Sequence, residues 1–171
     1  MASSVSIRAA KPEDAPAIAA IYAPQVLHGT ASFEENPPDA TEMLRRMKHV
    51  LDLGLPYLVA EIGGEVAGYA YAGRFRERAA YRITVEDSVY VAERFHRRGV
   101  ARKLMQRLIE ICASSNYREM VAVISDPVVN CASVELHRSL GFQDAGLLRG
   151  IGQKFGRTID VLILQRTLAG D

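Results

Sequence analysis

Apolar residues along the chain fall into short runs that predict a sheet. Several segments have the strand signature of alternating or continuous apolar residues bounded by turn residues. The predicted strands are Ser4–Ala9, Tyr57–Ile62, Val66–Ala72, Thr84–Val91, Met120–Ile124, Leu147–Phe155 and Thr158–Thr167. Gly63-Gly64 predicts a tight hairpin between the second and third of these, and Gly156 a turn between the last two. The run MVAVI predicts a central strand that is buried on both faces.

Between these strands, apolar residues recur at helical spacing. The predicted helices are one that Pro12 opens, one that follows NPPDAT and ends near Leu53, Gly99–Ser114 and Cys131–Leu140. In the third helix, Val100, Leu104 and Leu108 lie on one face. Gly141 stands where a left-handed residue ends a helix. The alternation of strands and helices indicates a mixed α/β sheet.

Composition limits the class of protein. The chain has 171 residues, 49% of them hydrophobic, so we expect one domain spanning residues 1–171. A net charge of +1 gives no general attraction to nucleic acid or to an anionic membrane. No run approaches the roughly 20 apolar residues of a membrane span, and the N-terminal segment lacks a signal-peptide core. We therefore expect a cytoplasmic protein without nucleic-acid or membrane partners.

Metal and disulfide chemistry find no support in the sequence. Cys112 and Cys131 lack CxxC or Cys/His spacing, and we expect both to be small apolar residues of the interior. The histidines His28 and His49 have no ligand-like neighbours. No metal site is expected.

The segment HRRGVA, His96 to Ala101, joins a strand to a long amphipathic helix. The first N–H groups of such a helix have no intrahelical partner and point outward at the positive end of its dipole. HRRGVA lacks the GxxxxGK[ST] loop and the three glycines of a dinucleotide turn. It predicts a shorter anion site, with Gly99 allowing close approach of a pyrophosphate. The alternative is an ordinary strand–helix connection with a solvated basic face.

A second segment, NCASVELHRSLGF, places Asn130 at a helix start and Ser133 and His137 on one face of that helix. Together the two segments resemble the GNAT superfamily of N-acetyltransferases, which has a [QR]xxGx[GA] turn and often an N-xx-[AS]-xxx-Y-xxx-GF helix. Within it the chain is most similar to phosphinothricin and methionine sulfoximine acetyltransferases. The segments of finer resemblance are RAAKPEDAPAIAAIYAPQV, GRFRERAAYRITVEDSVYV, VNCASVELHRSLGF and GQKFGRTIDVLILQ.

The resemblance implies a single-domain GNAT fold, a mixed, mostly antiparallel twisted sheet of about seven strands flanked by about four helices. It also implies acetyl-CoA as co-substrate and a homodimer. The implied cofactor contacts are Val89, Tyr90, Val91, Arg97, Arg98, Gly99, Val100, Ala101, Asn130 and Ser133. The chain has His96 where the family has Gln or Arg, and Ala101 where it usually has Gly, and its link SDPVV before Asn130 is about two residues longer than in close relatives.

Acetyl transfer to an ammonium group requires a base, because only the neutral amine attacks. The resemblance at TVEDSVYV assigns this role to Glu86, and strand alternation groups Glu86 with Ser88 and Tyr90 unless a bulge intervenes. On spacing alone, Glu86 reads as a surface residue at a strand end. The N–H of Val91 is expected to face the thioester carbonyl. His137 occupies the family's tyrosine position, as the acid for the thiolate, a second base, or a core histidine.

The arginine-rich segment GRFRERAAYR suits an anionic group on the acceptor, because arginine binds carboxylates and phosphinates through a fork of N–H donors. A solvated loop is the alternative. The resemblance places the amino-acid acceptor around this segment. The implied substrate-binding residues are Phe75, Arg76, Glu34, Arg74, Val85 and Asp87, with Glu34 on the amine side.

The sequence thus predicts acetyl-CoA-dependent N-acetylation of the α-amine of a small amino-acid analogue such as phosphinothricin, methionine sulfoximine or methionine sulfone. Transfer is expected to be direct, in a ternary complex, because no activated nucleophile is visible. Two alternatives stay open. One is acetylation of another amine, a protein N-terminus or a polyamine, and the other is a non-catalytic acyl-CoA-binding module.

Overall fold

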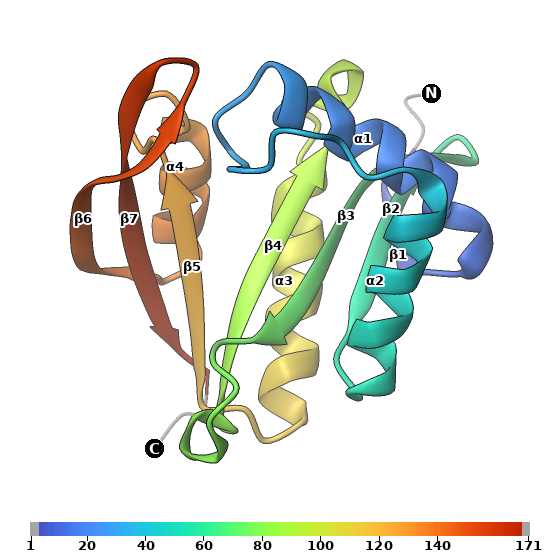
Figure 1. Cartoon of the computed structure of the whole chain (residues 1–171). Coiled ribbons are helices and arrows are strands. Elements are labelled where there is room, and N and C mark those ends of the chain that lie inside the picture. Colours follow the sequence, from blue (N-terminus) through green and yellow to red (C-terminus); the bar gives the residue numbers. More distant parts are fainter. Residues whose placement is uncertain (1–3, 169–171) are drawn as a thin grey trace.

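Seven strands form one twisted sheet in the order β1-β2-β3-β4-β5-β7-β6 in the computed structural model, which describes residues 4–168 (Figure 1). The strands are β1 Ser6–Ala9, β2 Tyr57–Ile62, β3 Glu65–Arg74, β4 Thr84–Val91, β5 Glu119–Ser125, β6 Gln143–Lys154 and β7 Arg157–Thr167. The neighbours β4 and β5 are parallel, whereas the other neighbouring strands are antiparallel. The predicted mixed, mostly antiparallel α/β sheet is confirmed.

Four α-helices cover the two faces of this sheet. They are α1 Ala15–Leu27, α2 Ala40–Asp52, α3 Val100–Ser114 and α4 Cys131–Ser139, and short 3-10 turns occupy Pro12–Asp14, Ala79–Tyr81 and Glu93–Phe95. The helices α1 and α2 lie on one face of β1–β4, and α3 and α4 lie on the other face of the sheet (Figure 1). Pro12 opens a 3-10 turn and not the α-helix itself, which starts at Ala15.

The predicted turns have the backbone that their sequences require. Gly63 and Gly64 have φ of 61° and 82°, as a two-residue hairpin turn needs. Phe155 and Gly156 form the corresponding turn between β6 and β7, with φ of 53° and 75°. The strand β6 begins four residues earlier than predicted, at Gln143, because QDAG pairs as an exposed edge without any apolar alternation.

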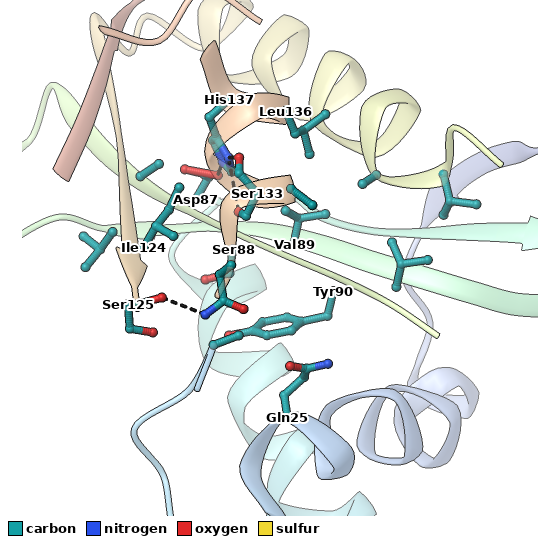
Figure 2. A pocket seen from close by; sticks show the side chains of 18 of the residues that line it. Gln25, Asp87, Ser88, Val89, Tyr90, Ile124, Ser125, Ser133, Leu136 and His137 are labelled. Atoms are coloured by element: carbon teal, nitrogen blue, oxygen red, sulfur yellow. Dashed lines mark hydrogen bonds and ion pairs between the residues drawn. The ribbon is translucent and has the colours of Figure 1, made fainter. Parts of the chain in front are cut away.

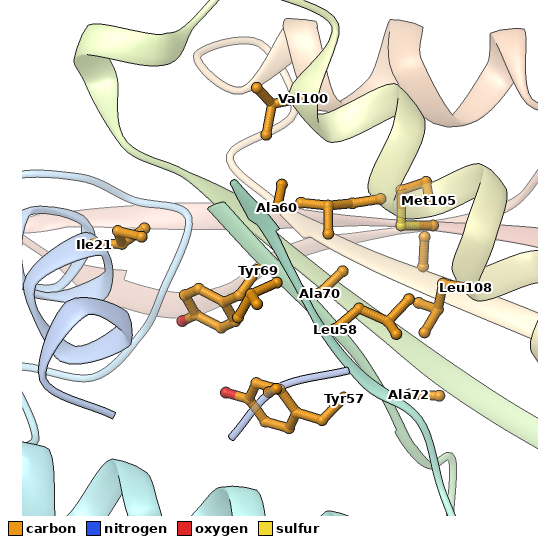
Figure 3. Packing of buried hydrophobic residues seen from close by; sticks show 14 of the residues in the cluster. Ile21, Tyr57, Leu58, Ala60, Tyr69, Ala70, Ala72, Val100, Met105 and Leu108 are labelled. Atoms are coloured by element: carbon orange, nitrogen blue, oxygen red, sulfur yellow. The ribbon is translucent and has the colours of Figure 1, made fainter. Parts of the chain in front are cut away.

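Small residues bring α3 close to the sheet. Figure 3 shows Met105 and Leu108 of α3 beside Ala60, Ala70 and Ala72, while Tyr57 and Tyr69 extend from the opposite face towards α1 and α2. Gly68 contributes to this approach. A Cβ atom there would lie 2.8 Å from the Tyr90 carbonyl oxygen and 3.1 Å from a methyl group of Val100. Close packing of α3 fixes the position of its N-terminus.

In the β5–β7–β6 part of the sheet, an α-helix covers only one face. The α4 side buries Ala122 and Ile124, but Val123 on the other face is 43% exposed. The prediction that MVAVI is buried on both faces is therefore wrong at Val123. The edge strand β6 is exposed over nearly its whole length.

Candidate active site

A cleft opens where β4 and β5 separate. The two strands pair over only three residue pairs, Thr84–Glu86 with Glu119–Val121, and then diverge. A cavity of about 810 Å³ lies between them. It is lined by residues of β4 and β5, the turn before α3, the first turns of α4 and the loop after α1 (Figure 2). The segments that the sequence singled out, TVEDSVYV, HRRGVA and the Asn130 helix, meet here.

Backbone N–H groups of β4 point into this cleft. Ala92 donates to the Ala67 carbonyl at 2.9 Å, so antiparallel alternation makes Gly68 and Val91 a pair without mutual hydrogen bonds. The N–H groups of Val91 and Val89 therefore face away from β3, towards the side where β5 has already diverged. They are available as donors to a ligand in the cleft.

The turn before α3 has the geometry of an anion site. Arg97 and Gly99 both have positive φ, 60° and 74°, and Gly99 is the N-cap of α3. Lys103 is the first residue to donate along the helix, to the Gly99 carbonyl at 3.1 Å, and no side chain caps the N-terminus. The N–H groups of the first turn, including those of Val100 and Ala101, thus face outward with the dipole behind them.

Contacts within the protein also shape this turn. A Cβ atom on Gly99 would have nothing within 4 Å, so in the protein itself the glycine is needed for its positive φ. Arg98 lies over the Phe95 ring at 5.6 Å, and Arg94 lies over the same ring at 4.9 Å. The ring of His96 contacts the Val91 carbonyl at 3.1 Å, which braces the turn against the end of β4.

Glu86 is half-buried in the cleft wall. The register of β3 and β4 is unbroken, so Glu86, Ser88 and Tyr90 share one face, as alternation predicted. Tyr90 contacts Tyr22 of α1 edge to face at 5.0 Å, which identifies this face as the α1 side. Burial raises the pKa of Glu86, with a further contribution from the charge of Asp87 and opposition from Arg76. A carboxylate with a raised pKa is a better proton acceptor for an ammonium group.

His137 and Asp87 form a buried pair on the opposite face of β4. Nε2 of His137 lies 2.7 Å from Oδ2 of Asp87, and Nδ1 lies 2.7 Å from the Ser133 carbonyl oxygen. The side chains are only 3% and 2% exposed. Burial alone would lower the pKa of His137, but the hydrogen bond and charge of Asp87 raise it overall. Both ring nitrogens thus donate to acceptors, and the imidazole is held as a cation.

This arrangement bears on three of the roles that the resemblance implied, and for His137 it favours the core-histidine alternative. His137 does not fit the role of acid for the departing thiolate, because both of its N–H groups are already engaged (Figure 2). Asp87 does not fit as a substrate contact, because its carboxylate turns to His137. Val85 is 1% exposed within the core, so its side chain does not reach a substrate. Strand alternation places Val85 and Asp87 on the face opposite to Glu86.

Asn130 and Ser133 lie in the cleft wall as expected. Asn130 donates to the Ser125 carbonyl at 2.7 Å and to the Thr30 hydroxyl at 3.3 Å. These bonds hold Asn130 in place despite the long link before it, in which Asp126 pairs with Arg157.

Cys131, predicted to be an interior residue, is exposed, whereas Cys112 is buried.

The predicted acceptor segment lies just before β4, and none of Phe75, Arg76 and Arg74 lines the cavity. The guanidinium of Arg76 lies 4.6 Å from the centre of the Phe75 ring, which packs against Tyr81. Arg74 lies 3.6 Å from Glu77 in an exposed ion pair. Arg76 is close enough to counteract the raised pKa of Glu86. An anionic group held by Arg76 would therefore lie near the base.

Glu34 is already paired with a cation. Arg46 lies 2.6 Å from it, the Tyr22 hydroxyl donates to it at 2.8 Å, and Arg46 holds the pKa of Glu34 below its usual value. Glu34 lines a second cavity, of about 190 Å³. The other lining residues include Tyr57 of β2, Tyr69 and Tyr71 of β3, and residues of α2. Sequence reasoning missed this tyrosine cluster, for which the signal was tyrosine at alternate positions of β3.

Residues 4–168 contain no group of three or more His, Cys, Asp or Glu side chains placed to hold a metal ion. The helices of this part of the chain are all too short or too polar to cross a membrane.

The chain is similar in sequence to known proteins over nearly its whole length. Residues 7–163 match the family model described as acetyltransferase (GNAT) domain. Phosphinothricin N-acetyltransferase of Alcaligenes faecalis is 52% identical over 97% of this chain and 84% of its own length. The L-methionine sulfoximine/L-methionine sulfone acetyltransferase of Pseudomonas aeruginosa is 40% identical over 96% of this chain and 95% of its own length.

A solved structure extends the similarity to a ligand complex. The crystal structure of a phosphinothricin acetyltransferase from Sinorhizobium meliloti in complex with acetyl-CoA superposes with a TM-score of 0.93 at 40% identity. It covers 96% of this chain and 89% of that chain.

Proposed function

The chain belongs to the GNAT acetyltransferase family, and from this premise we propose that it transfers the acetyl group of acetyl-CoA to the α-amine of phosphinothricin, methionine sulfoximine or a similar amino acid. The observation that carries the proposal is one strand, β4, which presents free N–H groups to the cleft and a half-buried carboxylate on the face towards α1. Relatives that act on these amino acids share more than a third of their sequence with this chain.

The cleft suits acetyl-CoA as co-substrate. The N–H groups of Val89 and Val91 would bind the pantetheine arm and the thioester carbonyl oxygen, with Tyr90 between them. Asn130 and Ser133 form the facing wall on α4. The pyrophosphate would bind at the N-terminus of α3. The residues assigned to it are Arg97, Arg98, Gly99, Val100 and Ala101.

Direct transfer needs only a base and an oxyanion donor from the protein. Glu86 takes a proton from the α-ammonium, directly or through water, and the neutral nitrogen attacks the thioester carbonyl carbon. The Val91 N–H stabilises the negative charge that develops on the carbonyl oxygen. The nitrogen of the tetrahedral intermediate loses its second proton to water, the carbon–sulfur bond breaks, and the thiolate of coenzyme A leaves and is protonated by solvent. We assign His137 to the pair with Asp87 and not to this proton.

The acceptor is proposed to bind beside Glu86. Arg76 and Phe75 would hold its anionic group, with Arg74 contributing charge from the same segment. Glu34 is proposed to border the amine side, where it is paired with Arg46. A small molecule with both an amine and an anionic group satisfies the base and the arginines together.

We further propose that the protein is a homodimer and works in the cytoplasm. The β5–β7–β6 region exposes the apolar side chains of Val123, Leu147, Leu148 and Ile151, which a partner subunit would cover. Two free cysteines suit a reducing compartment. Analytical ultracentrifugation of the wild-type chain tests the dimer, since a monomer at micromolar concentration would contradict it.

One assay tests the function. Release of the coenzyme A thiol from acetyl-CoA is measured with methionine sulfoximine, methionine sulfone and phosphinothricin, and with peptide N-termini and polyamines as the competing acceptors. The proposal expects the highest kcat/KM on the three amino-acid analogues. Activity confined to peptides or polyamines would overturn the acceptor class. Acetyl-CoA binding without any turnover would indicate a non-catalytic module.

A further inference from the structure

The loop between α1 and α2, residues 28–39, forms a strap across the cleft. It contains no helix or strand, and it runs from α1 past the C-terminal ends of β4 and β5 towards the β6–β7 hairpin before returning to α2 (Figure 1). Ala31 and Phe33 of the strap line the same cavity as Glu86. The strap belongs to the α1 side of the sheet, the side to which Glu86 points, whereas the turn before α3 lies on the other side.

Lys154, at the end of β6, is the cation to which the strap is tied. Its Nζ donates to the carbonyl oxygens of Ser32 at 2.7 Å, Gly29 at 2.9 Å and Gln25 at 3.3 Å. Three N–H donors thus meet three main-chain acceptors. Lys154 is 4% exposed and forms no ion pair with a carboxylate of residues 4–168. Gln25 lies in the last turn of α1, where the helix dipole is negative and favours a cation.

A second contact joins the strap to β6. The ring of Phe33 packs directly on the backbone of Gly152, where an added Cβ atom would lie 2.3 Å from the ring. Other bonds tie the strap to its neighbours. The Tyr22 hydroxyl lies 2.6 Å from the Ser32 hydroxyl, and Ser125 donates to the Thr30 carbonyl. The strap therefore bridges α1, β5 and the β6–β7 hairpin.

Lys154 has a role here that other residues cannot easily fill. An irregular segment must satisfy its buried carbonyls with donors, because a buried carbonyl left without a donor is destabilising. A lysine ammonium is a point charge with three donors, which fits three converging carbonyls. An arginine fork is planar and suits paired acceptors instead.

Resting on the proposed function, we propose that Lys154 is a positioning residue for the acceptor. It touches neither acceptor nor acetyl-CoA, but it holds the strap as the wall against which the acceptor binds beside Glu86. Without Lys154 the acceptor must order the strap as it binds, so the acceptor KM rises. Acetyl-CoA binding depends mainly on β4 and the turn before α3, and Asn130 keeps its shorter bond to the Ser125 carbonyl, so this binding is little affected.

The test compares Lys154→Met, Lys154→Arg and a matched control, Lys48→Met, at an exposed position of α2. We expect Lys154→Met to raise the KM for methionine sulfoximine tenfold or more at saturating acetyl-CoA, with the acetyl-CoA Kd from calorimetry within twofold of wild type. Hydrogen exchange should accelerate in residues 28–39 but not in β3 or β4. The acceptor KM of Lys154→Arg should lie between those of wild type and Lys154→Met, and Lys48→Met should have the wild-type KM.

A second variant addresses the strap without changing the charge. Gly152→Ala displaces Phe33 and should reproduce the same split between acceptor KM and acetyl-CoA Kd. Unchanged exchange of the strap with unchanged KM in both variants would overturn the proposal. So would equal losses of acceptor and acetyl-CoA binding, which indicate general loosening. If the wild-type protein acetylates none of the amino acids, the proposed function fails, and strap exchange in the acetyl-CoA complex still decides the role of Lys154.

Discussion

Replacing His137 by leucine should destabilise the protein because it leaves the Asp87 carboxylate buried and without its cation. The two side chains are 3% and 2% exposed; Oδ2 of Asp87 bonds to His137, and Oδ1 has no hydrogen-bond partner among the described residues. Removing one partner of a buried pair costs about 3–5 kcal/mol. In a domain of this size, each kcal/mol lowers Tm by about 2–4 °C, so His137→Leu should lower Tm by about 6–20 °C.

A double variant separates the lost pair from lost packing. Asp87→Val/His137→Leu removes both charges, and such apolar replacements are often close to neutral. We therefore expect the double variant to be more stable than His137→Leu alone, as measured by urea unfolding at pH 7. Additive losses in the double variant would refute the argument. Turnover by folded His137→Leu should also remain near wild type, whereas a proton donor to the thiolate would lose kcat.

The same pair makes stability depend on pH. The pKa of His137 is raised in the folded protein, so its contribution is complete below the unfolded value of about 6.5 and is lost as pH rises through the folded pKa. Wild-type unfolding free energy should fall over that window. The double variant should lack this part of the pH dependence.

Three further variants test the site. Gly99→Val should weaken acetyl-CoA binding tenfold or more, about 1.4 kcal/mol, since φ of 74° is unfavourable for valine; unchanged calorimetric affinity in a folded variant would contradict this. Glu86→Gln should lower kcat/KM for methionine sulfoximine, with partial recovery at high pH, where more amine is neutral; a wild-type pH–rate profile would remove Glu86 as the base. Arg76→Ala should mainly raise the acceptor KM, by an amount that corresponds to about 1.5–3 kcal/mol of binding free energy for a charged hydrogen bond, and leave the acetyl-CoA Kd unchanged. Steady-state kinetics at saturating acetyl-CoA measure the KM, and an unchanged KM would contradict this role of Arg76.

Local patterns predicted the parts of the site that depend on one segment. The face of Glu86 followed from alternation, because β4 pairs with β3 without a bulge. The outward N–H groups before α3 followed from a glycine between a strand and an amphipathic helix. The hairpin at Gly63-Gly64 followed from the need for positive φ at two consecutive residues.

Features that depend on distant partners could not be predicted. Asp87 lies 50 residues before His137, and only the fold shows that both ring nitrogens meet acceptors. Lys154 looks like any surface lysine, because its partners are main-chain carbonyls without a sequence signature. Val123 is indistinguishable from its buried neighbours in MVAVI, since exposure depends on whether a helix covers that face.

The divergence of β4 and β5 has a consequence for cooperativity. The sheet consists of two halves, β1–β4 and β5–β7–β6, whose main chains are joined through only three residue pairs. A ligand that accepts hydrogen bonds along the open edge of β4 takes the place of a missing strand between them. Binding of such a ligand would raise the free energy of unfolding, because a ligand that binds only the folded state stabilises that state by RT ln(1 + [L]/Kd). A co-substrate bound in this way would join the two halves of the sheet in addition to supplying the acetyl group.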